Sequence, residues 1–256
     1  MKLTKRNYFS RKANKLYMSV SQFKSFEKCQ ACALAELQGK YERETTTALL
    51  VGSYVDSYFE GTLNKFKQEN PDIFKKDGTL KAEYIQAEAI INRIERDKLF
   101  TEYMSGKKQV IMSGEIKGVP IKIKIDSLHP DKIVDLKIMK DFSNVYSSEK
   151  GVQSWFEAWG YDLQGAVYQE IVRQNTGKKL PFYLAAATKE THTDIDIVHI
   201  GQEILDFALE RFEQNVELYD AIKKGIIEPE RCDKCDYCKD SKVLTEPTEA
   251  ESFDLL

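Results

Sequence analysis

Alternating apolar and charged residues mark the segment 114–140, GEIKGVPIKIKIDSLHPDKIVDLKIMK. Alternate side chains of a β-strand share a face, so this pattern predicts strands at residues 119–127 and 132–138, each with one apolar and one charged face. Pro130 and Asp131 suit the centre of a tight turn between the two strands. A slip of one residue would bury the charged set, so the pattern specifies the register of the hairpin as well as its existence.

The register brings two carboxylates together. A hairpin symmetric about the turn places Asp126 directly opposite Asp135, with their Cβ atoms roughly 5 Å apart. Facing carboxylates repel unless a proton or a cation lies between them, and Mg²⁺ prefers carboxylate oxygens. Lys137 shares the face of Asp135, where an ammonium group can hold a water or stabilise charge on a phosphate. The hairpin therefore predicts a divalent-metal site, and the alternative is a solvated hairpin with scattered charges.

Helical and strand-like segments follow one another along the rest of the chain. Apolar residues at helical spacing predict helices at residues 19–38, 47–60, 81–99, 151–175 and 202–224. Further strands are expected at residues 109–117, 181–188 and 194–200, the last as an edge strand. Helices, then a strand meander, then a helix and more strands describe an α/β layer fold.

Length and composition limit the class of protein. The 256 residues fit one large domain or a domain with a small appendage, and 42% hydrophobic residues suffice for a core. No apolar run approaches the ~18 residues needed to cross a bilayer, and the first residues do not resemble a signal peptide. We therefore expect a cytoplasmic protein that does not bind membranes.

The two ends of the chain differ in charge, although the net charge is only −3. Residues 1–28 contain eight Lys or Arg and a single acid, Glu27. The basic arm at residues 1–16 can neutralise phosphates, and the alternative is a solvated, partly mobile terminus. The acidic tail at residues 239–256 is expected to be disordered.

The cysteines are clustered. Cys232, Cys235 and Cys238 place three thiols within seven residues, which can bind a soft metal. A fourth thiol could come from Cys29 or Cys32. The residues alone leave three interpretations open: an iron–sulfur cluster, a zinc ion, or a metal-free knuckle of reduced thiols.

The charged hairpin resembles a known signature. Asp126 followed by Asp135-Leu136-Lys137 on the neighbouring strand resembles the PD-(D/E)XK nuclease motif, with Ile125 where the family has Pro. The resemblance implies a restriction-endonuclease-like core, a mixed central sheet flanked by helices. It also implies that Asp126, Asp135 and the Leu136 carbonyl hold Mg²⁺ or Mn²⁺, while Lys137 orients the attacking water.

Two more segments strengthen this resemblance. Gln164 and Tyr168, one helical turn apart, are similar to the Q-x-x-x-Y motif that follows D-x-K in RecB-like and RecE-like nucleases. YMSVSQFKSFEKC at residues 17–29 resembles the opening segment of RecB-type nuclease domains. The resemblance implies that Gln164 and Tyr168 position the DNA backbone or support the site, whereas the alternative is an ordinary helix surface.

A further metal ligand is expected from outside the hairpin. VGSYVDSYFEG at residues 51–61 resembles the next family helix, in which a His ligates the metal, and Asp56 occupies that position here. Asp binds Mg²⁺ at least as readily as His. We expect Asp56 or Glu115 to complete the site, with Glu60 as a weaker candidate.

The cysteines have a counterpart in the same nucleases. Some RecB-like nucleases join their chain ends through an iron–sulfur cluster held by one early and three late cysteines. This sequence resembles that arrangement, with Cys29 in the better-matching position. The resemblance implies a structural [4Fe–4S] cluster on Cys29, Cys232, Cys235 and Cys238, and zinc is the other metal considered.

Residues 17–238 look most similar to phage-type exonucleases of the RecE (exonuclease VIII) group. The resemblance implies a single nuclease domain at residues 1–238, which includes a cysteine knuckle at 232–238. It also implies that this domain degrades linear duplex DNA from its ends, for recombination or phage DNA processing. Its implied partners are duplex DNA ends, a single-strand annealing recombination protein and further copies of the chain. The alternatives are a non-catalytic DNA-binding or assembly module and a nuclease acting on single strands or RNA.

Overall fold

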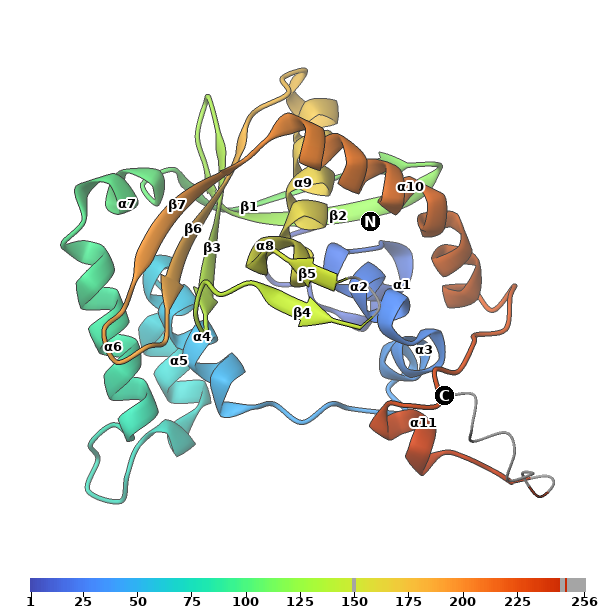
Figure 1. Cartoon of the computed structure of the whole chain (residues 1–256), viewed down its shortest axis with the longest axis horizontal. Coiled ribbons are helices and arrows are strands. Elements are labelled where there is room, and N and C mark those ends of the chain that lie inside the picture. The colour runs from blue at the N-terminus through green and yellow to red at the C-terminus, as the bar shows by residue number, and fades with distance from the viewer. Residues whose placement is uncertain (149–150, 245–246, 248–256) are drawn as a thin grey trace.

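A five-stranded mixed sheet forms the centre of the structure, a computed structural model that describes residues 1–148, 151–244 and 247 (Figure 1). The strands, in their order across the sheet, are β1 (Lys107–Ile116), β2 (Val119–Leu128), β3 (Ile133–Met139), β6 (Phe182–Thr188) and β7 (Ile195–Ile200). Neighbouring strands are antiparallel, except that β3 and β6 are parallel. The α/β fold, its mixed sheet and the edge position of β7 are confirmed.

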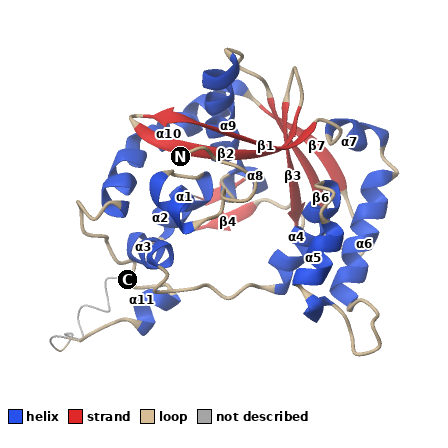
Figure 2. Cartoon of the chain, turned by 180° about the vertical axis from the view of Figure 1, so that it is seen from behind, coloured by secondary structure: helices blue, strands red, loops and turns tan. Residues whose placement is uncertain are grey.

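Helices cover both faces of this sheet (Figures 1 and 2). The helices of the first face are α2 (Val20–Lys28), α3 (Gln30–Gln38), α9 (Tyr161–Thr176) and α10 (Gln202–Lys223). The helices of the second face are α4 (Thr47–Phe59), α5 (Leu63–Glu69), α6 (Ala82–Glu95) and α7 (Lys98–Tyr103). A short 3₁₀ helix, η1 (Pro71–Ile73), joins α5 to the segment before α6.

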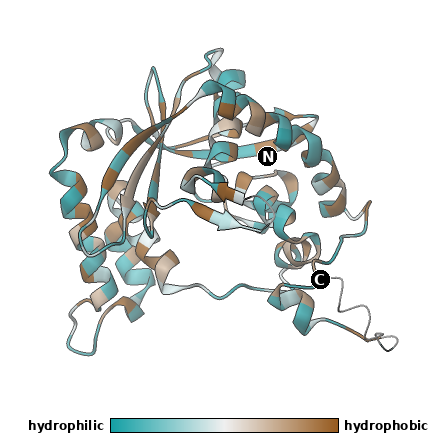
Figure 3. Ribbon diagram, in the orientation of Figure 1, coloured by the Kyte–Doolittle hydropathy of each residue, from teal (hydrophilic) through white to brown (hydrophobic). Residues whose placement is uncertain are grey.

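Strand β3 supplies residues to two hydrophobic cores, one on each face. Ile133 packs in the core of α2, α9 and α10, whereas Val134 and Leu136 pack in the core of α4 and α6. Figure 3 shows the central strands coloured largely as apolar. Burial on both faces explains why β6 is a nearly continuous apolar run.

The helix expected at residues 19–38 is interrupted. Ser19 begins α2 as expected by accepting a hydrogen bond from the Gln22 N–H, but α2 ends at Lys28 and α3 begins at Gln30. Cys29 lies between them in an extended conformation, with φ −166° and ψ 112°. Its thiol contacts other cysteines of the chain, and these contacts are a tertiary feature that helical periodicity does not contain.

Two other expected helices are also divided. The segment 81–99 forms α6 and then α7, because the Asp97 side chain caps α7 by accepting from the Phe100 N–H at 2.9 Å. The segment 151–175 begins instead with strand β5 (Gly151–Gln153), which pairs with β4 (Val145–Ser147). A capping box of Ser154 and Glu157 then starts the short helix α8 (Trp155–Ala158), which precedes α9.

The N-terminal arm is a packed part of the structure rather than a solvated terminus. Its helix α1 (Arg11–Leu16) leads to Met18, whose N–H donates to the Pro120 carbonyl at 2.8 Å. Lys122, which strand alternation places on the charged face of β2, is buried beneath the arm. Its Nζ donates to the Tyr8 carbonyl at 2.5 Å and to Asn14 Oδ1 at 2.6 Å.

The acidic tail begins later than expected. Lys239 and Asp240 belong to helix α11 (Asp236–Asp240). Residues 245–246 and 248–256, to which the expectation of disorder also applied, lie outside the described residues. In the described part of the chain, no helix is both long enough and apolar enough to cross a bilayer.

Replacing Lys122 tests whether it anchors the arm. Lys122→Ala should lower the free energy of unfolding by about 1–3 kcal/mol, because two buried acceptors lose their donor. Lys140→Ala is the control, since the side chain of Lys140 is 95% exposed, and should stay within about 0.5 kcal/mol of the parent. Urea denaturation measures both, and equal stability of the two variants would rule out the anchoring role.

Candidate active site

Strands β2 and β3 diverge where the two carboxylates meet. The pairing comprises Ser127 with Val134 and Leu128 with Ile133, which is the register that the sequence predicts, and it ends before Asp126 and Asp135. In place of a further ladder bond, Asp126 Oδ2 accepts the N–H of Leu136 at 3.0 Å. The Asp126 side chain therefore lies in the gap between the two strands.

Asp135 and Lys137 form a buried ion pair on the same face of β3. Asp135 is 1% exposed, and its Oδ2 contacts the Lys137 ammonium. Burial raises the pKa of Asp135 to about 7, although the charge of Lys137 opposes that shift. Burial alone would lower the pKa of Lys137, but the charges of Asp135 and Asp126 outweigh it and raise this pKa above its ordinary value. Lys137 therefore stays protonated near neutral pH.

Helix α9 supports both strands from the first face of the sheet. Gln164 Nε2 donates to Asp135 Oδ1 at 2.8 Å, so this amide fixes the carboxylate directly. The hydroxyl of Tyr168 donates to the Lys124 carbonyl at 3.1 Å and so holds β2 two residues before Asp126. The structure thus brings both residues of the Q-x-x-x-Y pair to the site and gives them different contacts.

Helix α4 brings a third carboxylate into the same cavity. Asp56 lines it together with Asp126 and Asp135. Burial, followed by the charge of Asp126, raises the pKa of Asp56 well above its ordinary value. Glu60, one turn further along, lies with its Oε1 at 3.4 Å from Lys124 Nζ. The structure therefore groups Asp56 with the hairpin carboxylates and pairs Glu60 with a lysine.

Glu115 lies elsewhere, and its expected place at the site is wrong. It is exposed and pairs with Pro120 in the β1–β2 ladder. Pro120 and Asp126 are six residues apart along β2, a separation of about 20 Å in an extended strand. The Glu115 N–H donates instead to Gln174 Oε1 at 3.0 Å. A carboxylate at that distance cannot share a cation with Asp126.

The donor set fits a hard divalent cation. The cavity has a volume of about 380 Å³, and four carboxylates line it, of which Glu60 is paired with Lys124. The N–H of Leu136 faces Asp126, and the N–H and C=O of one strand residue point to the same side, so the Leu136 carbonyl also faces the gap. Carboxylate and carbonyl oxygens are the ligands that Mg²⁺ and Mn²⁺ prefer. Asp56, Asp126, Asp135 and Leu136 are therefore the residues suited to hold such an ion.

Gln109 contacts the site, and the sequence analysis did not identify it. The β1–β2 ladder pairs the residues on either side of it but not Gln109 itself, and its Nε2 donates to Asp126 Oδ1 at 3.1 Å. Its φ of +54° is unusual for a strand residue other than glycine. Its Oε1 is buried and has no hydrogen-bond partner among the described residues. Strain and an unpartnered buried atom beside a reactive group are features of functional sites.

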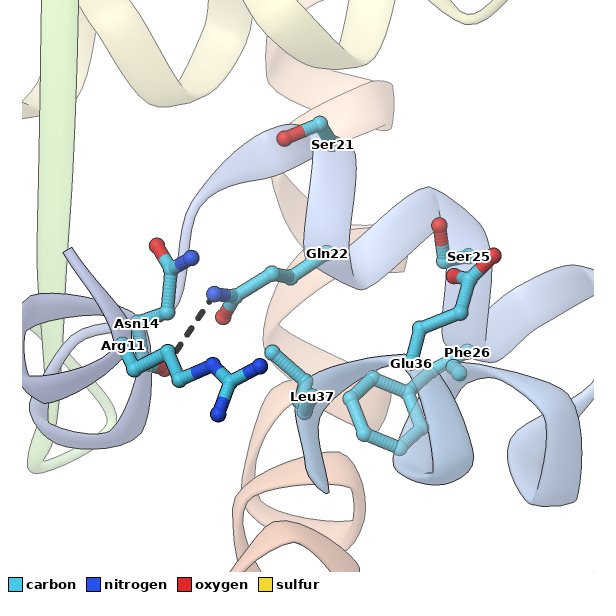
Figure 4. Close-up of a pocket in the computed structure, with 9 residues that line it drawn as sticks. Arg11, Asn14, Ser21, Gln22, Ser25, Phe26, Glu36 and Leu37 are labelled. Carbon is cyan, nitrogen blue, oxygen red and sulfur yellow. Dashed lines mark hydrogen bonds between the residues drawn. The ribbon is translucent and has the colours of Figure 1, made fainter. Parts of the chain in front are cut away.

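A second, smaller cavity adjoins the carboxylate cavity. It has a volume of about 230 Å³ and lies among α1, α2 and α3 (Figure 4). Asn14, Ser21, Gln22 and Leu37 line both cavities. Gln22 Nε2 donates to the Asn14 carbonyl at 3.1 Å, the bond drawn in Figure 4. The active-site cavity is thus continuous with polar space among the N-terminal helices.

Four cysteines meet at a separate centre. The Sγ atoms of Cys29, Cys232, Cys235 and Cys238 all lie within 4.8 Å of one another. Figure 1 shows that α11 lies beside α3. This contact brings the C-terminal part of the described chain against its N-terminal helices. Cys32 is outside this group, and its Sγ accepts from Arg43 Nη2 at 3.8 Å. Of the two early cysteines considered, Cys29 is therefore the one grouped with the triplet.

Comparison with known proteins agrees with this geometry. Residues 19–241 match the family model described as a PDDEXK-like domain of unknown function (DUF3799). The chain belongs to this PDDEXK-like family. Its fold is that of PD-(D/E)XK nucleases, so the resemblance in the sequence is confirmed at the level of the superfamily. Among curated proteins, no sequence matches the chain.

A solved structure gives the same result. The chain is similar to a protein from Eubacterium rectale named "Putative exonuclease", at a TM-score of 0.94 and 50% sequence identity. The match covers 99% of this chain and 98% of that one. Together with the PDDEXK-like family, this similarity supports a nuclease.

Replacing Gln109 tests its contribution to the metal site. Gln109→Leu removes the amide while keeping much of its volume, and should weaken Mn²⁺ binding about 10- to 100-fold, the usual effect of losing a partner that orients a metal ligand. Calorimetric titration measures this affinity. Gln68→Leu, on an exposed position of α5, is the control and should bind Mn²⁺ like the parent. Equal affinities of the two variants would exclude a supporting role for Gln109.

Proposed function

We propose that the chain is a divalent-metal-dependent exonuclease that hydrolyses phosphodiester bonds of linear duplex DNA. The observation that carries the proposal is the grouping of Asp56, Asp126 and Asp135 with Lys137 in one cavity of a PD-(D/E)XK fold. The similarity to a protein named as an exonuclease favours attack from DNA ends. In this proposal residues 1–238 act as one nuclease domain.

The mechanism assigns a role to each side chain. Asp126, Asp135 and the Leu136 carbonyl would hold Mg²⁺ or Mn²⁺, with Asp56 as a further ligand. A bound ion supplies a water of lowered pKa and polarises a phosphoryl oxygen. Lys137, held protonated by the neighbouring carboxylates, acts as a hydrogen-bond donor that orients the attacking water and stabilises negative charge on the phosphate.

Neighbouring residues keep this arrangement in place. Gln164 fixes Asp135 through its amide, and Tyr168 fixes the β2 backbone through the Lys124 carbonyl. The resemblance to RecE-type enzymes extends the proposal to recombination or phage DNA processing. It also extends to an annealing-protein partner and to assembly of several copies of the chain.

Two substitutions test the reacting centre. Asp135→Asn keeps the shape of the side chain and removes a metal-binding charge, whereas Lys137→Ala removes the donor and leaves the metal ligands. Both should reduce cleavage of end-labelled linear duplex DNA by about 10²–10³-fold or more. They should differ in calorimetry, because only Asp135→Asn should weaken Mn²⁺ binding strongly. Near-parental cleavage by either folded variant would show that the assigned site is wrong.

The substrate topology separates an exonuclease from an endonuclease. With Mg²⁺, linear duplex DNA should be degraded while covalently closed circles persist, and EDTA should stop the reaction. Equal cutting of circles would replace the exonuclease proposal with an endonuclease. No cleavage of either DNA by the folded parent protein would favour a non-catalytic DNA-binding module.

We also propose a structural metal at the cysteine quartet, and the thiol geometry favours zinc over an iron–sulfur cluster. Cys238 Sγ lies 3.5 Å from Cys29 Sγ and 3.9 Å from Cys232 Sγ. Four thiolates about 2.3 Å from one tetrahedral ion are separated by about 3.8 Å, whereas a cluster of several irons needs more space between them. Backbone N–H groups of Lys234 and Cys235 lower the pKa of Cys232 to about 6, whereas burial raises the pKa of Cys29 and of Cys235, so Cys232 is the thiol of these three that most readily becomes a metal-binding thiolate.

Metal analysis tests this centre. The purified protein should contain zinc in equimolar amount, and Cys238→Ser should lose the metal and melt at a lower temperature. Cys32→Ser is the matched control, because Cys32 is buried but lies outside the quartet, and should keep the zinc. A brown protein containing several irons per chain would establish the cluster instead, and the absence of both metals from an anaerobic preparation would eliminate the centre.

A further inference from the structure

A third cavity adjoins the active-site cavity and extends it toward solvent. It has a volume of about 720 Å³ and lies between the N-terminal segment and α5. Phe9, Asp56, Glu60 and Lys124 line both cavities. We call this third cavity the arm groove, after the residues 1–16 that form one of its walls. It offers a continuous path from the surface to the carboxylates.

The arm groove carries positive charge on its outer part. Lys5 and Arg6 line it, both are exposed, and neither forms an ion pair within residues 1–148, 151–244 and 247. Of the three acids that line the groove, Asp56 belongs to the carboxylate site and the other two have basic partners. Glu60 is paired with Lys124, and Glu69 lies 3.6 Å from Lys65 Nζ. Unpaired cations beside a reactive site favour a polyanion such as a nucleic-acid backbone.

Phe9 stands where the arm groove meets the active-site cavity. Its side chain is 70% exposed, so most of the ring is without protein contact. The ring has two contacts: the Lys124 ammonium lies over one face, 5.1 Å from the ring centroid, and the Tyr8 ring makes a T-shaped contact at a centroid distance of 4.9 Å. Tyr8 is itself buried and held by Lys122. An exposed aromatic ring with one face against a lysine can stack on a base through its other face.

The size of the active-site cavity limits what reaches the carboxylates. Its 380 Å³ is the volume of a pocket for one small ligand, which corresponds to a nucleotide of one strand and not to a duplex. An unpaired strand therefore fits this cavity more readily than a duplex does. Its neighbouring nucleotides would then lie in the arm groove, next to Phe9.

We propose that the arm groove binds a single DNA strand, with one base stacked on Phe9 and the adjoining phosphates near Lys5 and Arg6. This inference rests on the proposed nuclease function and names how its substrate strand is held. Stacking on an aromatic ring tolerates any base, so the groove suits an enzyme that proceeds along a strand irrespective of sequence. Phe9 is a positioning residue in this proposal, since it contacts the strand beside the scissile phosphate.

The test measures binding without cleavage. A short fluorescein-labelled oligothymidylate is titrated with the full chain in EDTA, and fluorescence anisotropy gives its affinity. Phe9→Ala should weaken binding about 5- to 150-fold, the range for losing one stacked base, whereas Phe9→Trp should restore it. Phe207→Ala is the matched control, because Phe207 is 69% exposed but belongs to α10, and should bind like the parent.

Kinetics then separate this inference from the proposed function. With Mg²⁺ and linear duplex DNA, Phe9→Ala should raise KM more than it lowers kcat, and its melting temperature should match the parent's. If the parent cleaves DNA but Phe9→Ala binds the oligothymidylate and cleaves as the parent does, the groove proposal alone fails. If the parent cleaves no DNA, the nuclease proposal fails even where the oligothymidylate binds through Phe9. Stronger loss of binding to a blunt duplex than to the oligothymidylate would show that the groove holds paired DNA and overturn the single-strand proposal.

Discussion

The buried carboxylate of Asp135 is the constraint on which the site depends. Removing one charge from water costs several kcal/mol unless partners offset it, and the surrounding elements supply those partners. Lys137 lies two residues further along the strand, and Gln164 reaches across from α9. Two further carboxylates, Asp126 and Asp56, add negative charge to the same cavity. Among the described residues only Lys137 forms an ion pair with one of these three carboxylates, and a divalent cation would add positive charge beside them.

The sequence was sufficient to predict the hairpin, because its information is local. Strand alternation and a Pro-Asp turn determine which residues of β2 and β3 face each other, so the proximity of Asp126 to Asp135 follows from the local pattern alone. Glu115 shows the limit of that reasoning. It is an acid on a neighbouring strand, yet the β1–β2 register places it beside Pro120, at the other end of the hairpin. Proximity in sequence to a motif does not establish proximity in space.

The features that escaped prediction depend on contacts between distant segments. The break at Cys29 exists because its thiol joins cysteines from the end of the chain, and helical spacing alone gives no sign of it. The basic arm packs on the sheet because Lys122 of β2 donates hydrogen bonds to Tyr8 and Asn14 of the arm. Strand alternation places Lys122 on the charged face but does not show which segment covers it. Gln109 belongs to no recognisable sequence motif. Only its positive φ and its hydrogen bond to Asp126 indicate that it supports the site.

The cysteine quartet gives the fold an unusual mechanical property. Cys29 and Cys238 are separated by 209 positions, so a metal held by both closes most of the chain into one coordinated loop. Tension applied to the two ends of the chain would pass from α2 through the thiolates to α11. The strands with Asp126, Asp135 and Lys137 lie inside that loop, whereas part of the cavity wall, including Asn14 and Gln22, lies before it. A metal on the quartet would thus couple the C-terminal segment of the chain to α2, which forms part of the wall of the carboxylate cavity.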